Sequence, residues 1–429
     1  MKEMKHNSKI KPLTYISLFS SAGVGCYGFK QEDFECVATN EIIERRLEVQ
    51  RANKKCLYES GYISDDITKK ETQAKILKEL EFWRAEHNVL DLDVLIATPP
   101  CQGMSVANHK KNNELKRNSL VVESIKIVNQ IRPKVFIFEN VRAFLNTSCT
   151  DIDNKERTIR EAIEVNLGGR YNVHYQVINF KDYGNPSSRT RTLVIGVRKD
   201  IPEVTPLDLM PSMKSGYTLR EAIGDLASLK TMGELSSDDI YHNFRSYKEY
   251  MLPWIETIKE GQSAFDNKDP KRRPHQIKDG KIVFNENKNG DKYSRCYWDK
   301  VAPCVHTRND ILASQATVHP VDNRVFSIRE LMRMMSVPKT FNWVGIPLDE
   351  LNQLSEEQKR KILRKEEINI RQSLGEAVPT VIFASIAEKL KKKIHSKQLT
   401  DTQIKQFIIT NKLDIQENLK TFLKDNLDK

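Results

Sequence analysis

The feature that most constrains the fold is an alternation of short apolar runs with amphipathic stretches over residues 13–200. Such alternation is typical of strand and helix units around a parallel sheet. We expect strands at residues 15–19, 34–38, 94–97, 135–138, 173–178 and 192–197. Two helices between them are indicated by apolar residues on one helical face: Ile76, Leu80 and Trp83, then Leu120, Val121, Ile125 and Val128. The sequence therefore predicts a doubly wound α/β sheet.

After residue 200 the alternation ends in a stretch rich in Lys, Asp, Asn and Pro, with scattered aromatic residues that we interpret as the core of a smaller lobe. Helical character returns from Ser327 to Met335, and residues 377–390 have the apolar spacing of a packed helix. We expect a sheet lobe at 13–200 completed by 370–392, a second lobe at 201–325, a connecting helical segment at 326–369 and a charged appendage at 393–429.

Charge and cysteine content narrow the class of protein. With 69 Lys and Arg against 58 Asp and Glu, the net charge of +11 suits a polyanionic partner, although lysine-rich proteins of other classes share it. The seven cysteines are an odd number with no Cys-x-x-Cys pair, so neither a disulfide framework nor a metal site is expected. No apolar leader or membrane-length apolar run is present. We expect a cytoplasmic monomer without membrane contact.

A glycine-rich loop indicates a cofactor site. The first predicted strand runs into Gly23-Val-Gly25-Cys-Tyr-Gly28, and Glu41 stands at the end of the second. Glycines let the backbone approach a ligand, and a carboxylate there accepts hydrogen bonds from ribose hydroxyls. The pattern predicts an adenosine-containing cofactor, either a dinucleotide or S-adenosylmethionine, with an ordinary tight turn as the alternative. Asp66 suits an adenine amino group or, equally, a solvated turn.

Two further strand ends carry reactive side chains. The third strand ends in Thr98-Pro-Pro-Cys-Gln-Gly103, and Cys101 there lies where open α/β folds place ligands. A lone cysteine is more often a small buried hydrophobe. The next strand, however, ends in Glu139-Asn140-Val141, so a carboxyl and a thiol should face one crevice. Arg189 and Arg191, just before the last strand, place two cations on one side of the chain, with a structural surface pair as the alternative.

The order and spacing of these segments resemble the motifs of cytosine C5-specific DNA methyltransferases of the bacterial restriction-modification type. The matching segments extend from residue 15 to about 390. They are Phe19-Ser-Ser-Ala-Gly23, Thr39-Asn-Glu41, Asp66-Ile67, Pro99-Pro-Cys-Gln102, Glu139-Asn-Val141, Arg189-Thr-Arg191 and Gly375-Glu-Ala-Val-Pro379.

The resemblance implies a Rossmann-like fold that binds S-adenosyl-L-methionine. Phe19 would lie against the adenine, Glu41 would hold the ribose, and Asp66 and Ile67 would border the base. The rest of the implied cofactor site is Ser21, Gly23, Gly25, Pro99, Ala377 and Val378. Cys101 would be the nucleophile that attacks cytosine C6, Glu139 would contact the ring edge, and Arg191, with Arg189 beside it, would support the base from its O2 side. The target cytosine would be flipped out of duplex DNA.

The resemblance also implies that residues 201–318 read the DNA sequence. A basic loop there, Lys268-Asp-Pro-Lys-Arg-Arg-Pro-His275, is expected to contact DNA through Lys271, Arg272 and Arg273, with a solvated turn as the alternative. Gln102 and Ser105 are further expected DNA contacts. A cognate restriction endonuclease acting separately is the expected functional partner.

Three positions depart from the family pattern. Ser21 stands where a glycine is usual, Ser187 where glutamine is common, and Glu376 where the family has asparagine in Gly-Asn-x-Val. The third leaves a cofactor contact at Glu376 open, because a carboxylate can accept from the methionine ammonium but repels its carboxylate.

Other classes of protein explain fewer residues. A nicotinamide dehydrogenase accounts for the glycine loop and Glu41 but not for the remaining motifs. A tRNA cytosine C5 methyltransferase of the same fold is closer, yet the Cys-Phe-Thr tripeptide of that branch is absent. A nucleic-acid binder with a decayed site is disfavoured by the intact Cys101 and Glu139.

Overall fold

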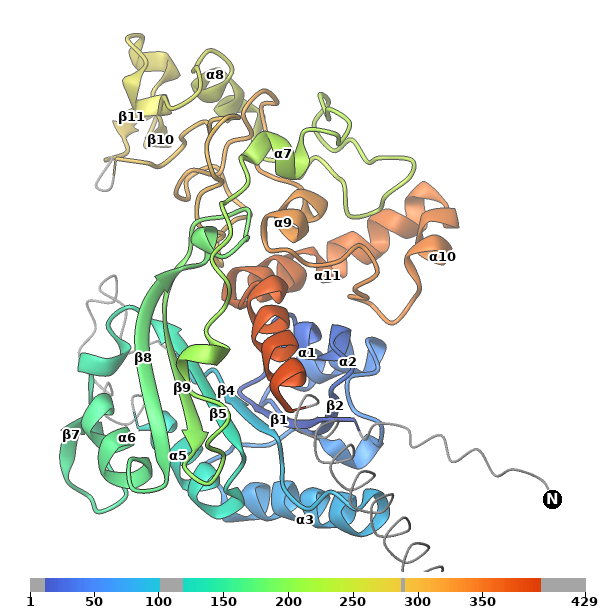
Figure 1. The fold of residues 1–429 in the computed structure, drawn as a ribbon. Helices are drawn as coiled ribbons and strands as arrows, with labels where there is room; N and C mark the ends of the chain where they lie inside the picture. Colours follow the sequence, from blue (N-terminus) through green and yellow to red (C-terminus); the bar gives the residue numbers. More distant parts are fainter. Residues whose placement is uncertain (1–11, 101–118, 287–289, 395–429) are drawn as a thin grey trace, which may run out of the picture.

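The computed structural model describes residues 12–100, 119–286 and 290–394, which form a sheet lobe with a second lobe above it (Figure 1). The sheet has seven strands in the order β3-β2-β1-β4-β5-β9-β8. Their bounds are β1 Thr14–Leu18, β2 Glu35–Asn40, β3 Tyr62–Ile63, β4 Val94–Ala97, β5 Val135–Val141, β8 Tyr171–Asn179 and β9 Thr190–Arg198. All six predicted strands are confirmed. The two-residue β3 was not predicted, because so short a strand has no measurable periodicity.

The sequence predicted a parallel sheet, whereas the observed sheet is mixed. β1, β2, β3, β4 and β5 pair in parallel, whereas β9 runs antiparallel to both β5 and β8. The start of β9 therefore lies at the same edge of the sheet as the carboxyl ends of β4 and β5. This reversal determines which side chains share the crevice.

Helices cover both faces of the sheet, because successive strand residues point to opposite sides. One face packs against α3 (Lys70–His87), α5 (Leu120–Ile131) and α6 (Ile159–Leu167). The other packs against α1 (Tyr27–Gln31) and the helical residues 380–394. The helical faces predicted from Trp83 and Val128 are confirmed, since both side chains are buried. Each such burial contributes about 1.5–3 kcal/mol to folding.

Local sequence signals determine where several helices begin. Thr158 and Glu161 form a reciprocal capping box at the start of α6, and Ser327 and Glu330 do the same at α9 (Ile328–Met334). Each box satisfies two backbone N–H groups that lack helical partners. The predicted helix from Ser327 to Met335 is thereby confirmed. A short hairpin, β6 (Ser148–Thr150) and β7 (Glu156–Thr158), precedes α6, and α2 (Glu44–Ala52) follows β2.

The second lobe has two cores. One joins α7 (Leu219–Ile223), α9, α10 (Leu348–Gln353) and α11 (Glu356–Glu376). The other lies at the outer end, where Trp254 of α8 (Leu252–Ile255) packs beside the hairpin β10 (His275–Lys278) and β11 (Lys281–Phe284) (Figure 1). Tyr241, Phe244 and Trp254 are buried as expected of core aromatics, whereas Tyr250 and Tyr297 are exposed. The expected boundary at residue 370 falls within α11.

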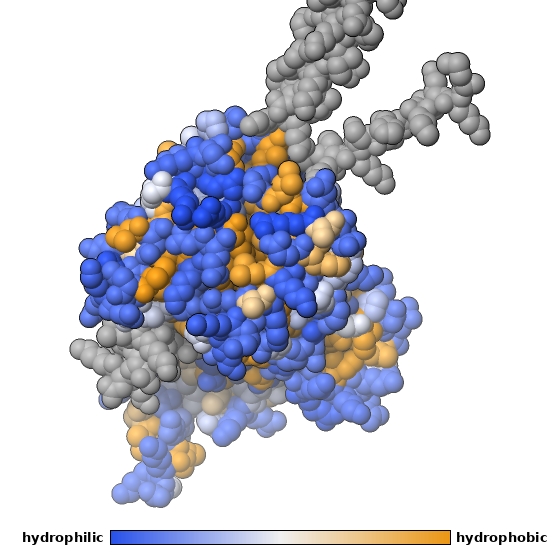
Figure 2. Space-filling model, turned by 90° about the horizontal axis from the view of Figure 1, so that it is seen from below, coloured by the Kyte–Doolittle hydropathy of each residue, from blue (hydrophilic) through white to orange (hydrophobic). Residues whose placement is uncertain are grey.

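The outer surface of the sheet lobe is mostly hydrophilic when seen from below, with hydrophobic residues in patches between charged ones (Figure 2). In the described part of the chain, no helix has the length and apolar character needed to cross a bilayer.

Candidate active site

The loop after β1 approaches the end of β2 through a series of unusual backbone angles. Phe19, Ser21 and Gly23 have φ values of 53°, 48° and 78°. This left-handed turn directs the backbone N–H of Ser21 to Oε2 of Glu41, at 2.8 Å, and the N–H of Ile43 donates to Oε1 at 3.1 Å. Glu41 is buried, and these two backbone donors fix the position of its carboxyl group. The carboxylate at the end of β2 is therefore fixed against the glycine loop.

This arrangement fits the ribose of an adenosine group. An ionised carboxylate offers about four acceptor sites, and backbone N–H groups take two of those on Glu41, leaving acceptors for two hydroxyls. Phe19 is half-buried beside the same loop, and Ile42, next to Glu41, is 64% exposed, so apolar surface is available for a ring. Ile42 was missed in the sequence because the two apolar residues Ile42 and Ile43 after a strand are too few to form a periodic pattern.

The glycines of the loop have two different roles. Gly23 packs over Gln50, whose Cγ would lie 2.9 Å from an added Cβ. Gly25 and Gly28 instead face residues 378–384. A Cβ added at Gly25 would lie 3.0 Å from Cβ of Val378, and one added at Gly28 would lie 2.4 Å from the backbone N of Ala384. At these two positions the close approach is between segments of the chain, which differs from the ligand approach expected from the pattern.

Two residues expected to border the base are held by the fold. Asp66 accepts from the N–H and Oγ1 of Thr68, at 2.9 and 2.8 Å, as expected of a turn residue. Ile67 is 3% exposed and belongs to the core between the sheet and helices α3, α5 and α6. Ala377 and Val378 are also buried, at the start of the C-terminal segment.

Residues 98–100, which follow β4 and precede the predicted nucleophile in the sequence, are anchored by two hydrogen bonds. Thr98 donates its hydroxyl to the carbonyl of Phe19 at 2.9 Å, and Asn140 Nδ2 donates to the carbonyl of Pro99 at 2.8 Å. Asn140 belongs to the Glu-Asn-Val motif at the end of β5, so the two neighbouring strand ends are tied together. Cys101, Gln102 and Ser105 lie outside the described residues.

Glu139 and Arg191 meet at the same edge of the sheet. Nε of Arg191 lies 3.2 Å from Oε1 of Glu139. The ion pair is poorly aligned for hydrogen bonding, and Oε1 has no hydrogen-bond partner within the described segments. Burial raises the pKa of Glu139, while the charges of Arg191 and Arg189 act to lower it. A buried carboxyl with a raised pKa and an unused oxygen is suited to proton donation.

Whereas Arg191 lies beside Glu139, Arg189 contacts backbone carbonyls of the second lobe. Its guanidinium donates to the carbonyls of Val305 (3.2 Å), Gly375 (3.0 Å) and Glu376 (3.3 Å), and its side chain is buried. It thus joins the sheet lobe to the second lobe and to the end of α11. The prediction of two cations acting together from one side of the chain is not supported by this geometry.

Arg46, His306 and Thr307, which lie outside the predicted motifs, complete the junction beside Gly375 and Glu376. An added Cβ at Gly375 would lie 2.5 Å from the backbone of His306 and Thr307, so this glycine permits close contact between α11 and residues 306–307. Arg46 of α2 forms an ion pair with Glu376 at 2.6 Å and approaches Glu41 at 3.5 Å. The departure at Glu376 is therefore accompanied by a cation.

The basic loop of the second lobe is partly engaged in local bonds. Arg272 contacts the hydroxyl of Thr257 at 3.3 Å, and Arg273 donates to the carbonyl of Asn267 at 2.6 Å. Lys271 is exposed. The loop leads directly into β10 at the outer end of the lobe (Figure 1).

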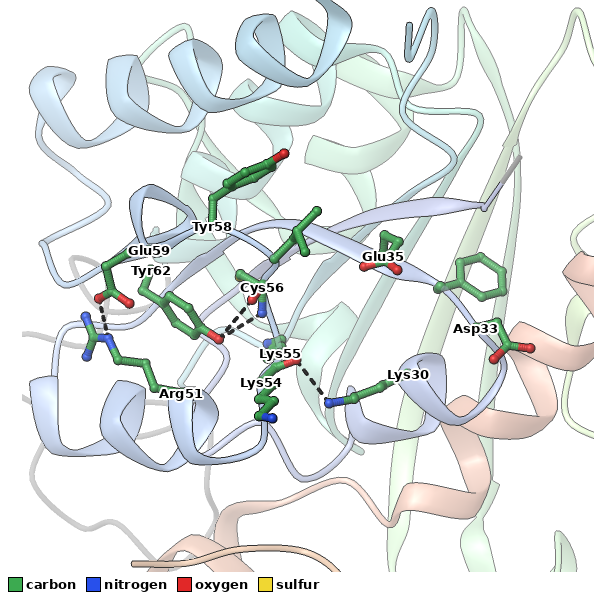
Figure 3. Close-up of a pocket in the computed structure, with 12 residues that line it drawn as sticks. Lys30, Asp33, Glu35, Arg51, Lys54, Lys55, Cys56, Tyr58, Glu59 and Tyr62 are labelled. Atoms are coloured by element: carbon green, nitrogen blue, oxygen red, sulfur yellow. Dashed lines mark hydrogen bonds and ion pairs between the residues drawn. The ribbon is translucent and has the colours of Figure 1, made fainter. Parts of the chain in front are cut away.

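A separate cavity of about 550 Å³ lies near the amino end of β2, beside Lys30, Glu35 and Tyr62 (Figure 3). Its charges are largely compensated: Arg51 pairs with Glu59 at 2.5 Å. Its lining extends from Glu35, the first residue of β2, to Tyr62 of β3, which pairs with Thr39 near the other end of β2. Glu41, Glu139 and Arg191 are not among the residues that line it.

The mostly parallel sheet, with a glycine loop after its first strand and a carboxylate at the end of its second, defines the Rossmann-like class of α/β proteins, which bind ligands at the carboxyl ends of their strands. The sequence profile of the C-5 cytosine-specific DNA methylase family matches residues 13–392, so the chain belongs to that family. It is a DNA (cytosine-5) methyltransferase, and the dehydrogenase and tRNA alternatives are not favoured.

Relatives agree with this assignment, and a solved structure shares the fold. The chain is 29% identical to the type II methyltransferase M1.HgaI of Avibacterium volantium, covering 89% of this chain and 98% of that protein. It is 30% identical to the type II methyltransferase M1.HphI of Haemophilus parahaemolyticus, covering 89% and 87%. In fold it is similar to an E. coli prophage protein described as a DNA modification methyltransferase, with a TM-score of 0.61, 17% identity and coverage of 89% and 99%.

Proposed function

We propose that this enzyme modifies one specific duplex DNA site with methyl groups from S-adenosyl-L-methionine and is the protecting half of a type II restriction-modification system. The naming of its relatives as type II methyltransferases supports the second part. A separate endonuclease would be its functional partner. The chain is proposed to act in the cytoplasm as a monomer, with the sheet lobe binding the cofactor and residues 201–325 reading the DNA.

The observation that carries the chemistry is the buried Glu139 beside Arg191, at the end of the strand next to the one that leads to Cys101. Cytosine C5 is a weak nucleophile, and addition of the Cys101 thiolate to C6 makes C5 electron-rich. Hydrogen bonding or proton donation from Glu139 to N3 absorbs the charge that develops on the ring. Arg191 keeps this carboxyl in place and supports the base from its O2 side.

The remaining proposed steps return the enzyme to its starting state. When bound, S-adenosyl-L-methionine supplies an electrophilic methyl group on a sulfonium. After C5 has been methylated, a base removes the C5 proton, and the bond between C6 and the Cys101 sulfur breaks to release the thiolate. Because C6 is inaccessible within a stacked duplex, the cytosine must be flipped into the crevice first.

The proposed cofactor contacts follow from the loop geometry. Glu41 accepts from the ribose hydroxyls, Phe19 lies against the adenine, and the backbone from Ser21 to Gly23 shapes the floor. Asp66 and Pro99 border the site. Lys271, Arg272 and Arg273 are proposed to contact DNA, with Gln102 and Ser105 on the Cys101 loop. Arg189 is proposed as a positioning residue that joins the lobes.

Bisulfite sequencing of genomic DNA from cells that express the chain tests the proposal. New 5-methylcytosine should appear at one sequence context, and none should appear with Cys101→Ser. Absence of methylation with the wild-type chain would overturn the proposed reaction. A covalent adduct with 5-fluorocytosine DNA that persists in Cys101→Ser would overturn the role of Cys101 alone.

A further inference from the structure

Three residues from separate segments, Ser21, Glu41 and Glu376, meet beside the guanidinium of Arg46. The cation on α2 lies 2.6 Å from Oε2 of Glu376, at the end of α11, and 3.5 Å from Oε1 of Glu41, at the end of β2. The hydroxyl of Ser21 donates to the same oxygen of Glu376 at 3.4 Å. Two of these residues, Ser21 and Glu376, are positions at which the chain departs from its family pattern.

Arg46 is the cation that separates two carboxylates, Glu41 and Glu376. One cation stands between two carboxylates, and its side chain is only 16% exposed. Without Arg46, Glu41 and Glu376 would repel each other in a partly desolvated site, where like charges interact strongly. Nε of Arg46 is buried and has no hydrogen-bond partner in the part of the chain that the structure describes. The arginine therefore retains a donor.

The position of Glu376 is fixed from the other side by Arg189. That guanidinium donates to the carbonyls of Gly375 and Glu376 at 3.0 and 3.3 Å. The backbone of Glu376 is thus tied to the strand that carries Arg191, while its carboxylate turns towards the glycine loop. A carboxylate at this point faces the cofactor side of the crevice, next to the residue that is proposed to hold the ribose.

The methionine end of the cofactor carries an ammonium and a carboxylate. A lone Glu376 would attract the first and repel the second. We propose that Arg46 and Glu376 act as a charge pair that binds this zwitterion, with Glu376 accepting from the ammonium and Arg46 facing the carboxylate. Arg46 is then a specificity-determining residue for the amino-acid end of the cofactor. The inference rests on the proposed use of S-adenosyl-L-methionine.

The role of Arg46 and Glu376 can be tested without turnover by measuring, with calorimetry, the affinity of the full chain for two adenosine ligands. S-adenosylhomocysteine carries the amino-acid end, and 5′-methylthioadenosine lacks it. Arg46→Ala should weaken binding of S-adenosylhomocysteine about tenfold, the size expected for one charge contact that is partly screened by solvent. The same variant should leave binding of 5′-methylthioadenosine within about twofold. Arg46→Gln, which keeps a polar side chain of similar reach, should give the same result if Arg46→Ala folds poorly.

The double variant tests whether the two residues act as a pair. Removing the charge of Glu376 with Arg46→Ala/Glu376→Gln should restore part of the affinity for S-adenosylhomocysteine, because no unpaired carboxylate remains. Arg45→Ala, the preceding arginine on α2, is the matched control and should bind both ligands as the wild type does. Thermal melting of each variant shows whether the fold is retained.

Three results would overturn the inference. Equal weakening for both ligands would mean that Arg46 acts on the ribose end through Glu41. Additive losses in the double variant would mean that Arg46 and Glu376 act independently. A wild-type chain that binds 5′-methylthioadenosine but gains nothing from the amino-acid end would exclude the charge pair. A wild-type chain that binds neither ligand would instead overturn the proposed cofactor itself.

Discussion

Nε of Arg191 lies 3.2 Å from Oε1 of Glu139 because β9 runs in the direction opposite to β5. In the antiparallel register Arg191 is opposite Val141 and Leu193 is opposite Glu139. In a parallel sheet the first residues of β9 would lie at the far edge, away from the carboxyl ends of β4 and β5. Strand direction therefore brings the cation to the buried acid, and the pH dependence of catalysis should reveal their coupling.

Removal of the Arg191 charge should shift the pH profile of methyl transfer. Burial raises the pKa of Glu139, and Arg191 opposes that rise. In Arg191→Gln the pKa should therefore rise further, so the protonated acid persists to higher pH. The alkaline limb of the rate should move upward in pH, while the plateau rate falls about 10²-fold because a fixed donor is lost. Single-turnover methyl transfer across a pH series measures both effects.

Glu139→Gln is the control for this assignment. The amide cannot ionise, so the alkaline limb should vanish, and the rate should fall by about 10²–10⁴-fold, as is usual when a general acid is lost. An alkaline limb that is unchanged in Glu139→Gln would assign the titration to another group.

Gly375→Ala should damage the contact between the end of α11 and residues 306–307. Glycine to alanine within a helix ordinarily stabilises a protein by up to about 1 kcal/mol. Here the new Cβ would lie 2.5 Å from the backbone of His306 and Thr307, so the backbone must move. Since Gly375 also accepts from Arg189, we expect a lower melting temperature together with weaker methyl transfer.

Gly169→Ala provides a matched comparison, because no atom lies within 4 Å of a Cβ added there. That variant should keep its stability within about 0.5 kcal/mol of the wild type. Equal melting temperatures for the two alanine variants would contradict the packing role of Gly375.

The sequence predicted the central strands and the buried helix faces because each carries strong periodicity. Trp83 and Val128, which lie on the predicted apolar faces of two helices, are buried. The direction of β9 was not predictable, since alternation of apolar residues is the same in a parallel and an antiparallel strand. The motif Arg189-Thr-Arg191 could not show which of its two arginines lies beside Glu139.

Arg46 shows why part of the site was hidden. It lies on a charged helix, among Glu44 and Arg45, where nothing in the local pattern distinguishes one charge from the next. Its partner Glu376 follows 330 positions later in the chain. Only the tertiary fold brings them together. The departure at Glu376 was visible in the sequence, but the cation that compensates it was not.

Lys271→Ala should weaken DNA binding equally for cognate and unrelated duplexes. Lys271 is exposed in the basic loop, while Arg272 and Arg273 already bond to protein groups. Loss of one phosphate contact should reduce the slope of log affinity against log salt by about 0.9. Fluorescence anisotropy over a salt series measures this slope. Lys78→Ala on α3, remote from the second lobe, should leave it unchanged (Figure 1).

A buried ion cluster within the second lobe should contribute strongly to the stability of that lobe. Arg324 is fully buried and donates to Asp322 at 2.8 Å and to both oxygens of Glu330 at 2.7 and 2.8 Å. Arg324→Met would leave two buried carboxylates without their cation, which typically costs about 3–5 kcal/mol. Urea unfolding should show this loss, and a change of less than about 1 kcal/mol would contradict it.

His319 beside this cluster should make stability depend on pH. Its Nδ1 accepts the N–H of Asp322 at 3.0 Å, so the folded ring is neutral there, and burial lowers its pKa to about 4. An unfolded histidine titrates near about 6.5. As pH falls from about 6.5 towards 4, the unfolded chain binds a proton that the folded chain does not, so the free energy of unfolding must decrease. Urea midpoints measured between pH 7 and 4.5 should fall accordingly. The decrease should be smaller in His319→Gln, because glutamine does not titrate; an identical decrease in that variant would assign it to other groups.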